Sequence, residues 1–155
     1  MAYLAEGNDD EALADLNTAL ALSEAFANAS NYRAYGDDYR QRGDTNTSIA
    51  RGIIPNIYYH RGLVYNRKED YHRAVSDFSK AIQLAPVFYY AFVGRGLTYM
   101  EIGDQPAAIV NFNRAIELNP KYAAAYQNRG AALNAMGREA EANVDFAKAK
   151  ELSAH

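Results

Sequence analysis

The pattern of apolar and polar positions from residue 55 onward is that of paired amphipathic helices. In the stretch 55–88, apolar residues and a glycine fall at i, i+4 and i+7, and the same spacing resumes after a short polar break. Such spacing places side chains on one face of a helix. The break at 67–70 is short enough to require an antiparallel hairpin, with Asp70 capping the second helix and Pro86 ending it. The positions on the two apolar faces are Tyr58, Gly62, Tyr65, Ala74, Phe78, Ala81 and Ile82.

The pattern of 55–88 returns at 89–122 and once more at 123–155. A fixed period in this range is typical of a solenoid, in which each unit is a pair of elements that cannot bury its apolar face alone. The small residues let the two backbones approach each other, and the aromatic rings fill the space around them. The positions that keep the interval are Gly62, Gly96 and Gly130; Ala74, Ala108 and Ala142; Phe78, Phe112 and Phe146; and Ala81, Ala115 and Ala149.

Within each unit the order is an aromatic residue, Gly, Tyr three residues on, then Ala, an aromatic residue, Ala and Pro. This order and the period of 34 resemble the tetratricopeptide repeat. The resemblance covers 55–155, with Leu133 where Tyr is usual and Ala154 where the closing Pro would fall. It implies an all-α fold, an α-solenoid of antiparallel helix hairpins wound into a right-handed superhelix. The first helix of each pair would line a concave groove that holds a peptide or a partner's helix.

We interpret 1–155 as a single domain with a less regular first third. Residues 1–26 form a partial repeat, 29–54 a degenerate repeat, and 55–88, 89–122 and 123–155 well-formed repeats. In the partial repeat a capping box of Asn8 and Glu11 precedes a clear second helix, whereas its first helix is mostly missing. The degenerate unit keeps a first-helix pattern from Tyr32. Its second helix is expected to be short, distorted or replaced by a loop through 44–54, and the stack to kink there.

Three arginines precede the repeat glycines, and Asp or Asn precedes the repeat aromatic residues of the second helices. They are Arg61, Arg95 and Arg129, and Asp77, Asn111 and Asp145. The arginines could form a row of anion sites. Because both sets share one period, we favour a structural interpretation in which each arginine pairs with the acidic or amide side chain on the facing helix.

The residues of the candidate groove follow from the resemblance, which places groove positions at the second, fifth, sixth, ninth and twelfth residues of each unit. Aromatic side chains suit recognition because they offer large area at small entropy cost, and amides can pair with a peptide backbone. The alternative is that these side chains only pack against neighbouring first helices. The candidate binding residues are Asn56, Tyr59, His60, Leu63, Tyr90, Val93, Leu97, Gln127, Asn128 and Ala131, with Gly94, Met100, Ala124 and Asn134 beside them.

Some tetratricopeptide domains hold the acidic C-terminus of heat-shock chaperones through Lys and Asn on successive first helices. The corresponding places in this chain carry Tyr59, Leu63, Val93 and Leu97. The resemblance therefore does not extend to that ligand.

Composition restricts the remaining function classes. The net charge of −3 provides no basic field for phosphate, so we expect no nucleic-acid partner. The chain has no cysteine, and none of its three histidines stands at metal-ligand spacing with another ligand. We find no nucleophile with a base and no phosphate loop, and so predict no catalytic residues, no metal and no cofactor. We also see no long apolar run and no export signal, which favours a cytoplasmic protein without membrane insertion.

The sequence thus predicts a protein-protein interaction module, not an enzyme, in a scaffold or adaptor role, with a protein or peptide ligand in the groove. One alternative is a self-associating or domain-exchanged array, a homo-oligomer joined through its uncapped ends. Another is a regulatory fragment of a larger protein.

Overall fold

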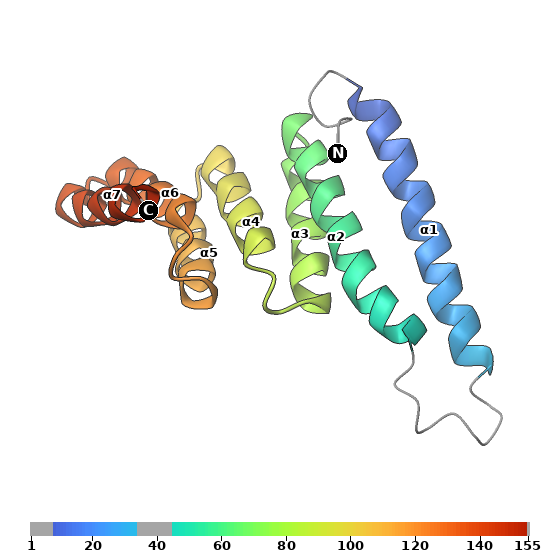
Figure 1. Ribbon diagram of the computed structural model, residues 1–155. Helices are drawn as coiled ribbons and strands as arrows, with labels where there is room; N and C mark the ends of the chain where they lie inside the picture. The colour runs from blue at the N-terminus through green and yellow to red at the C-terminus, as the bar shows by residue number, and fades with distance from the viewer. Residues whose placement is uncertain (1–7, 34–44, 155) are drawn as a thin grey trace.

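The computed structural model describes the backbone of residues 8–33 and 45–154, and the side chains of 8–25 and 52–154. Regular structure within these ranges is helical, and Figure 1 shows the helices side by side in chain order. The all-α expectation is confirmed. The helices are α1 (Asp9–Arg33), α2 (Thr45–Arg67), α3 (Tyr71–Leu84), α4 (Tyr89–Ile102), α5 (Gln105–Leu118), α6 (Ala123–Ala135) and α7 (Glu139–Ser153).

The helix ends follow local chemistry that the sequence already indicated. The carboxylate of Asp70 accepts a hydrogen bond from the backbone N–H of Arg73 at 3.1 Å, and that of Asp104 accepts one from Ala107 at 3.0 Å. Each bond satisfies a donor that the first turn of a helix leaves free. Gly103 ends α4 in the left-handed region at φ 89°, where a side chain would be strained. Short turns therefore join α2 to α3 and α4 to α5 as hairpins.

The hairpins close on aromatic rings that lie against glycine. A Cβ added to Gly62 would lie 2.9 Å from Cε1 of Phe78, and one added to Gly94 of the next unit would lie 2.6 Å from the same atom. The Phe78 ring thus occupies the space of two absent side chains, one on α2 and one on α4. Phe112 packs on Gly96 in the same way. Because both rings are fully buried, any added methyl group must displace them.

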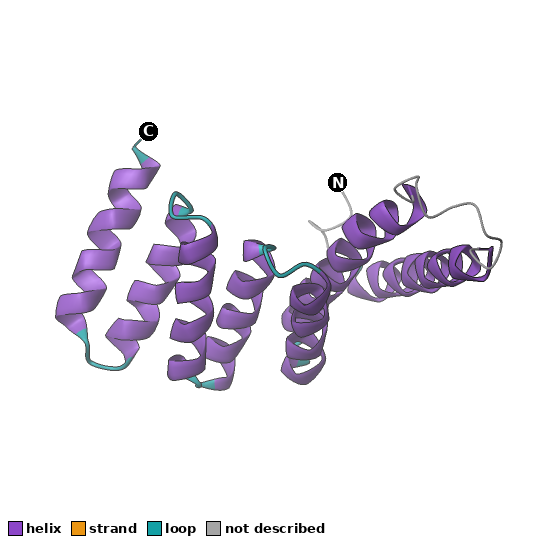
Figure 2. Cartoon of the chain, turned by 90° about the horizontal axis from the view of Figure 1, so that it is seen from below, coloured by secondary structure: helices purple, strands orange, loops and turns teal. Residues whose placement is uncertain are grey.

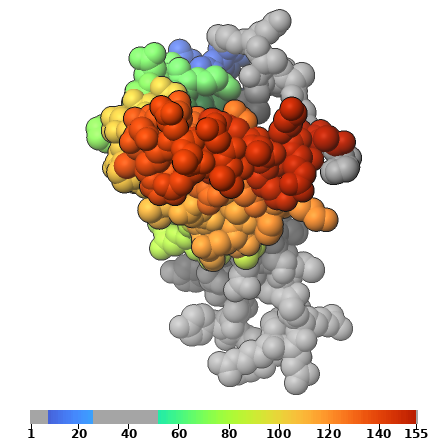
Figure 3. Space-filling model, turned by 90° about the vertical axis from the view of Figure 1, so that its left-hand side faces the viewer, coloured from blue at the N-terminus to red at the C-terminus, as the bar shows by residue number. Residues whose placement is uncertain are grey.

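Successive pairs stack into a solenoid, and Figure 2 shows the helices of the stack one beside the next. The first helices contact their successors directly, α2 with α4 and α4 with α6, whereas the second helices of neighbouring pairs do not approach each other. The first helices therefore line the inner side of the curve and the second helices the outer side. Figure 3 looks at the C-terminal end of the stack, where α6 and α7 face the viewer.

The structure corrects the expectation for 44–54. Residues from Thr45 onward are helical and continue without a break through Pro55 into the rest of α2. Ile54 and Ile57 are buried against Leu20 of α1. No loop separates 45–54 from the following unit, because this stretch extends the first helix of that unit by more than two turns.

The second correction concerns the degenerate repeat at 29–54. Helix α1 packs directly against α2, and Asn17 of α1 accepts a hydrogen bond from Arg61. Ser79 and Asn113 accept the same bond from Arg95 and Arg129 in the later units. Helix α1 thus makes the contact that second helices make in the later units, and it is followed in space by α2 with no further unit between them. Tyr32 lies in α1, and the rest of the expected first-helix motif at 36–43 lies outside the described residues.

Candidate functional site

The inner side of the stack carries an aromatic band, which we define as Tyr59, Phe88, Tyr89, Tyr90 and Tyr122. The Tyr59 ring of α2 lies 5.1 Å from Phe88 and 6.4 Å from Tyr90, measured between centroids. Tyr90 in turn lies 5.4 Å from Tyr122, the residue before α6. Tilted and edge-on contacts at these distances are favourable for aromatic rings. The band therefore connects α2, α4 and the start of α6 through continuous ring contacts.

The phenols of Tyr59, Tyr90 and Tyr122 stay uncharged over the physiological pH range. Burial raises the pKa of Tyr59, with a smaller effect from Tyr122, and burial likewise raises the pKa of Tyr122. A hydrogen bond with Tyr89 raises the pKa of Tyr90. Tyr90 is 39% exposed, which makes it more accessible than the other predicted aromatic residue, Tyr59. The band thus offers apolar ring faces together with neutral hydroxyl groups that can donate and accept hydrogen bonds.

The structure brings several predicted groove residues next to the band. Tyr59 and Tyr90 belong to it, and the His60 ring lies 5.2 Å from Tyr59 in an edge-on contact. His60 is half-buried, its Nδ1 has no hydrogen-bond partner among the described residues, and burial lowers the pKa of its imidazole. Leu63 packs against the core beneath the band. The middle of the predicted groove is therefore one contiguous aromatic surface.

Other predicted residues are less accessible to a ligand. Val93 is 6% exposed and belongs to the central core cluster, and Leu97 packs against that same cluster. Gly94 is buried against Phe78, so it sets the spacing of α3 and α4. At these positions the observed contacts agree with the alternative interpretation, in which the side chains only pack against neighbouring helices.

The remaining predicted residues lie at the two ends of the face. Asn56 is exposed, and its side-chain amide donates to the carbonyl oxygen of Gly52 at 2.6 Å. Gln127 is exposed, and Asn128 and Ala131 are half-buried on α6. None of the described ring contacts involves these residues. Ligand binding at the amide-rich end of the groove therefore stays a prediction, separate from the aromatic band.

The sequence reasoning missed Phe88, Tyr89 and Tyr122. Phe88 and Tyr122 precede the first residue of a first helix, α4 and α6, and they occupy the same position in successive repeats. A position just outside the helix does not appear in a helical-face pattern. The signal that could have found them was the recurrence of an aromatic residue two positions after the repeat prolines Pro86 and Pro120.

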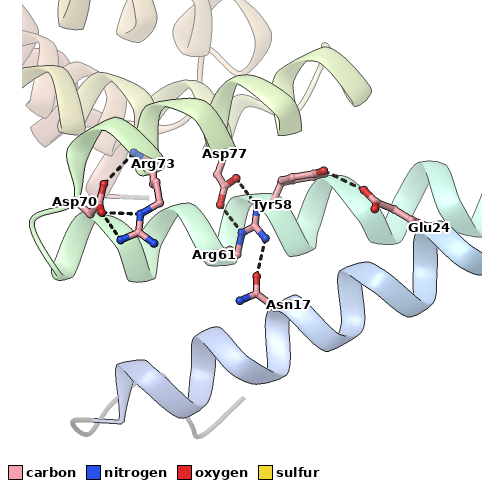
Figure 4. A network of polar contacts seen from close by, with 7 residues as sticks. All are labelled: Asn17, Glu24, Tyr58, Arg61, Asp70, Arg73 and Asp77. Carbon is pink, nitrogen blue, oxygen red and sulfur yellow. Dashed lines mark hydrogen bonds and ion pairs between the residues drawn. The ribbon is translucent and has the colours of Figure 1, made fainter.

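The predicted pairing of the arginines is confirmed. Arg61 donates to both carboxylate oxygens of Asp77 at 2.7 and 2.8 Å, as Figure 4 shows. Arg129 binds Asp145 in the same way, and Arg95 donates to Asn111. Hydrogen bonding to Asp77 and to Asp145 raises the pKa of Arg61 and of Arg129. Each guanidinium also bonds the second helix of the preceding unit, so the arginines join three helices apiece.

The architecture defines an all-α repeat solenoid, and comparison with known proteins agrees. Residues 55–88 match the family model described as tetratricopeptide repeat, and 96–137 match one described as TPR repeat. The chain belongs to the tetratricopeptide repeat family. Members of such repeat families generally use extended concave surfaces for binding rather than catalysis. The comparison with curated proteins finds no match.

Several solved structures resemble the chain. The crystal structure of MamA is 27% identical with a TM-score of 0.63, and the match covers 70% of this chain and 64% of MamA. The chain therefore spans less than two thirds of MamA. The first TPR of Spaghetti (RPAP3), bound to the HSP90 peptide SRMEEVD, is 26% identical over 64% of this chain and 79% of its own, with a TM-score of 0.63. The TPR2B domain of yeast Sti1, in complex with an Hsp70 peptide, is 26% identical over 64% and 80%, also at 0.63.

Metal-ligand clusters and membrane-spanning helices are both absent from the described residues. No group of three or more His, Asp or Glu side chains in the described part of the chain is placed to hold a metal ion. None of the described helices is both long and apolar enough to cross a membrane.

Proposed function

We propose that this chain is a protein-interaction module that binds a segment of a partner protein on the inner face of its first helices, in a scaffold or adaptor role. The aromatic band is the observation that supports the proposal. Tyr90 keeps 39% of its surface exposed although it contacts other rings, so a ligand can cover it at little entropic cost. The neutral hydroxyl groups would pair with the backbone of the bound segment.

The candidate groove differs in charge from a site for an acidic tail. Tyr59, Leu63 and Val93 are uncharged, and the His60 imidazole favours its neutral form. We propose that the groove takes an uncharged, apolar segment. The peptide SRMEEVD, which the similar Spaghetti domain binds, is therefore expected to bind weakly or not at all.

The test uses a random peptide library displayed on phage and selected against the wild-type chain. Selected peptides are measured by fluorescence polarisation against a Tyr59→Ala and Tyr90→Ala double variant. We expect affinity to fall at least about tenfold, the effect of losing about 1.4 kcal/mol of binding free energy. Tyr71→Ala, on the second helix α3, is the matched control and should bind as the wild type does. If the double variant stays folded and binds equally well, the groove is not the binding site.

Self-association is the second candidate. Val144 on α7 is 69% exposed. An exposed apolar residue on a terminal helix of a solenoid can dock a second copy. Light scattering over a wide concentration range separates the two: a strict monomer at high concentration would remove self-association and leave the peptide groove.

A further inference from the structure

The row of arginine pairs is interrupted in the middle unit. Arg61 and Arg129 each donate from Nε and Nη2 to the two oxygens of a carboxylate, at 2.6 to 2.8 Å. Arg95 faces Asn111, whose one oxygen accepts from Nε at 2.8 Å. The same position thus has a carboxylate partner in two units and an amide partner in the third. The middle guanidinium keeps its positive charge without a facing negative charge.

The hydrogen bonds of Asn111 leave part of this guanidinium unused. Nδ2 of Asn111 donates to the carbonyl oxygen of Ala107 at 2.8 Å, which fixes the amide with its single oxygen toward Arg95. Nη1 of Arg95 donates to the hydroxyl of Ser79 at 3.0 Å. Among the described residues, Nη2 has no acceptor, and it is not one of the fully buried atoms without a partner. Nη2 therefore keeps some exposure to solvent.

A cavity of about 460 Å³ opens beside Arg95. It is lined by residues of α4 and α5, among them Phe92, Asn111, Val110 and the ion pair of Arg114 with Glu117. Two arginines and one glutamate give this lining one net positive charge. Burial lowers the pKa of Arg95, whereas the facing carboxylates raise the pKa of Arg61 and of Arg129. The difference agrees with a charge that lacks its counter-ion.

We propose that this cavity binds a carboxylate group of a peptide, which supplies from the cavity the negative charge that Asp77 and Asp145 supply to Arg61 and Arg129 in the other units. Asn111 already accepts from Nε of Arg95, so an oxygen of the ligand would accept from Nη2 in a charge-assisted hydrogen bond. The carboxylate of Glu117 in the lining disfavours a doubly charged phosphate. At about 100° per residue, Arg95 lies about 140° around α4 from Tyr90, so this site is separate from the groove and does not depend on it.

The test is an NMR titration that follows the Nε–H signals of the arginines. Acetate is expected to shift the Arg95 signal saturably and to leave Arg61 and Arg129 unchanged, because their carboxylate partners are already in place. Acetamide, which has the same shape without the charge, should produce no shift. Equal shifts with both compounds, or a larger shift with inorganic phosphate, would overturn the carboxylate assignment.

Two capped peptides separate the possible sources of the group. Acetyl-Gly-Glu-Gly-amide carries a side-chain carboxylate, and acetyl-Gly-Gly-Gly with a free C-terminus carries a chain-end carboxylate. Saturable binding of either one supports the site and identifies its source. If acetate binds but neither peptide does, the assignment to a peptide carboxylate is wrong.

The variant Asn111→Asp provides the sharpest control, because it recreates the partner that Arg61 and Arg129 already have. We expect the variant to fold and to bind acetate at least about tenfold more weakly. Gln105→Glu adds the same charge at the start of α5 and should bind as the wild type does. Arg95→Lys keeps the charge but not the planar fork that can bond Asn111, Ser79 and the ligand together, and it should also bind more weakly. Unchanged affinity of Asn111→Asp for acetate would refute the site. Normal acetate binding by the Tyr59→Ala and Tyr90→Ala double variant would show that the site does not depend on the groove.

Discussion

Arg61 donates a hydrogen bond from Nη1 to the side-chain oxygen of Asn17 at 2.7 Å, across 44 residues of sequence. The corresponding bond from Arg129 to Asn113 spans 16 residues. The geometry is the same at both ends of the stack, although the first connection is much the longer. The repeat therefore continues from α1 to α2 in space, and the additional residues lengthen these two helices and the segment that joins them.

The first prediction concerns the additional residues of that longer connection. Deletion of 25–52 joins Glu24 to Ile53 and restores a uniform period, with Leu22 then falling at the position of Leu84 and Ile54 at that of Phe88. Because neighbouring helices of a solenoid supply most of its stability, we expect the shortened chain to remain helical and to unfold cooperatively. Circular dichroism and thermal unfolding check this. Loss of the contact between the Arg61 guanidinium and α1 in NMR spectra would contradict it, since the pairing is expected to survive.

The second prediction concerns the attachment of α1. Leu20 is 8% exposed and packs on Ile54 and Ile57. Leu20→Ala should weaken this contact by about 2 kcal/mol, the low end for a buried leucine, because the site is at the edge of the stack. Amide exchange should speed up in α1 and remain slow in α4 to α7. Leu22→Ala, at a position 67% exposed on the same helix, is the control, and equal effects from both variants would contradict the packing.

Local spacing predicted the regular part of this fold because each helix pair buries its own motif residues. Tyr65, Phe78 and Gly62 meet within one hairpin, so their sequence pattern is sufficient. The start of the chain was different. Tyr32 began a pattern that resembled a first helix, whereas the true neighbour of α1 was visible only through the contact of Asn17 with Arg61. A search for a fixed period assumes an even interval between repeats, and the additional residues between Asn17 and Arg61 break that interval.

The groove was predictable only in part for a related reason. The resemblance placed Val93 and Tyr90 on the same face, but Val93 is buried at 6% exposure and Tyr90 is accessible at 39%. Their difference depends on what the next unit places above them. Tyr122, which contacts Tyr90, lies outside any helix and so outside the helical pattern.

The third prediction tests the arginine pairs. Asp77 and Arg61 are both well covered, with side chains 5% and 16% exposed, so removal of the carboxylate leaves a charge without its partner. We expect Asp77→Ala to cost about 3 kcal/mol in the free energy of unfolding, measured in urea. Asp77→Asn reproduces the natural pair of Arg95 with Asn111 and should cost only about 1 kcal/mol. Equal losses would mean that packing, not charge, dominates at this position.

The fourth prediction concerns Gly94. A methyl group there would lie 2.6 Å from Cε1 of the buried Phe78 ring, so Gly94→Ala must push α3 and α4 apart. We expect a loss of about 1–3 kcal/mol despite the better helix propensity of alanine. Gly52→Ala is the matched control, because no atom lies within 4 Å of the added carbon and α2 is helical there. That variant should gain up to about 1 kcal/mol. A stable Gly94→Ala protein would show that the ring is not held between the two helices.

The fifth prediction concerns pH and His60. Burial lowers the pKa of this imidazole below its ordinary value of 6.5, so the unfolded chain binds a proton more readily than the folded chain does. The contribution of His60 to stability is therefore fully present above pH 6.5 and is lost progressively as pH falls from there to the folded-state pKa. His60→Asn, which places the residue of Asn128 at the equivalent position, should reduce this loss. Urea unfolding between about pH 7.5 and pH 5, with exposed His72→Asn as control, measures the difference. A wild type and a His60→Asn variant that lose stability in parallel would show that His60 is equally solvated in both states.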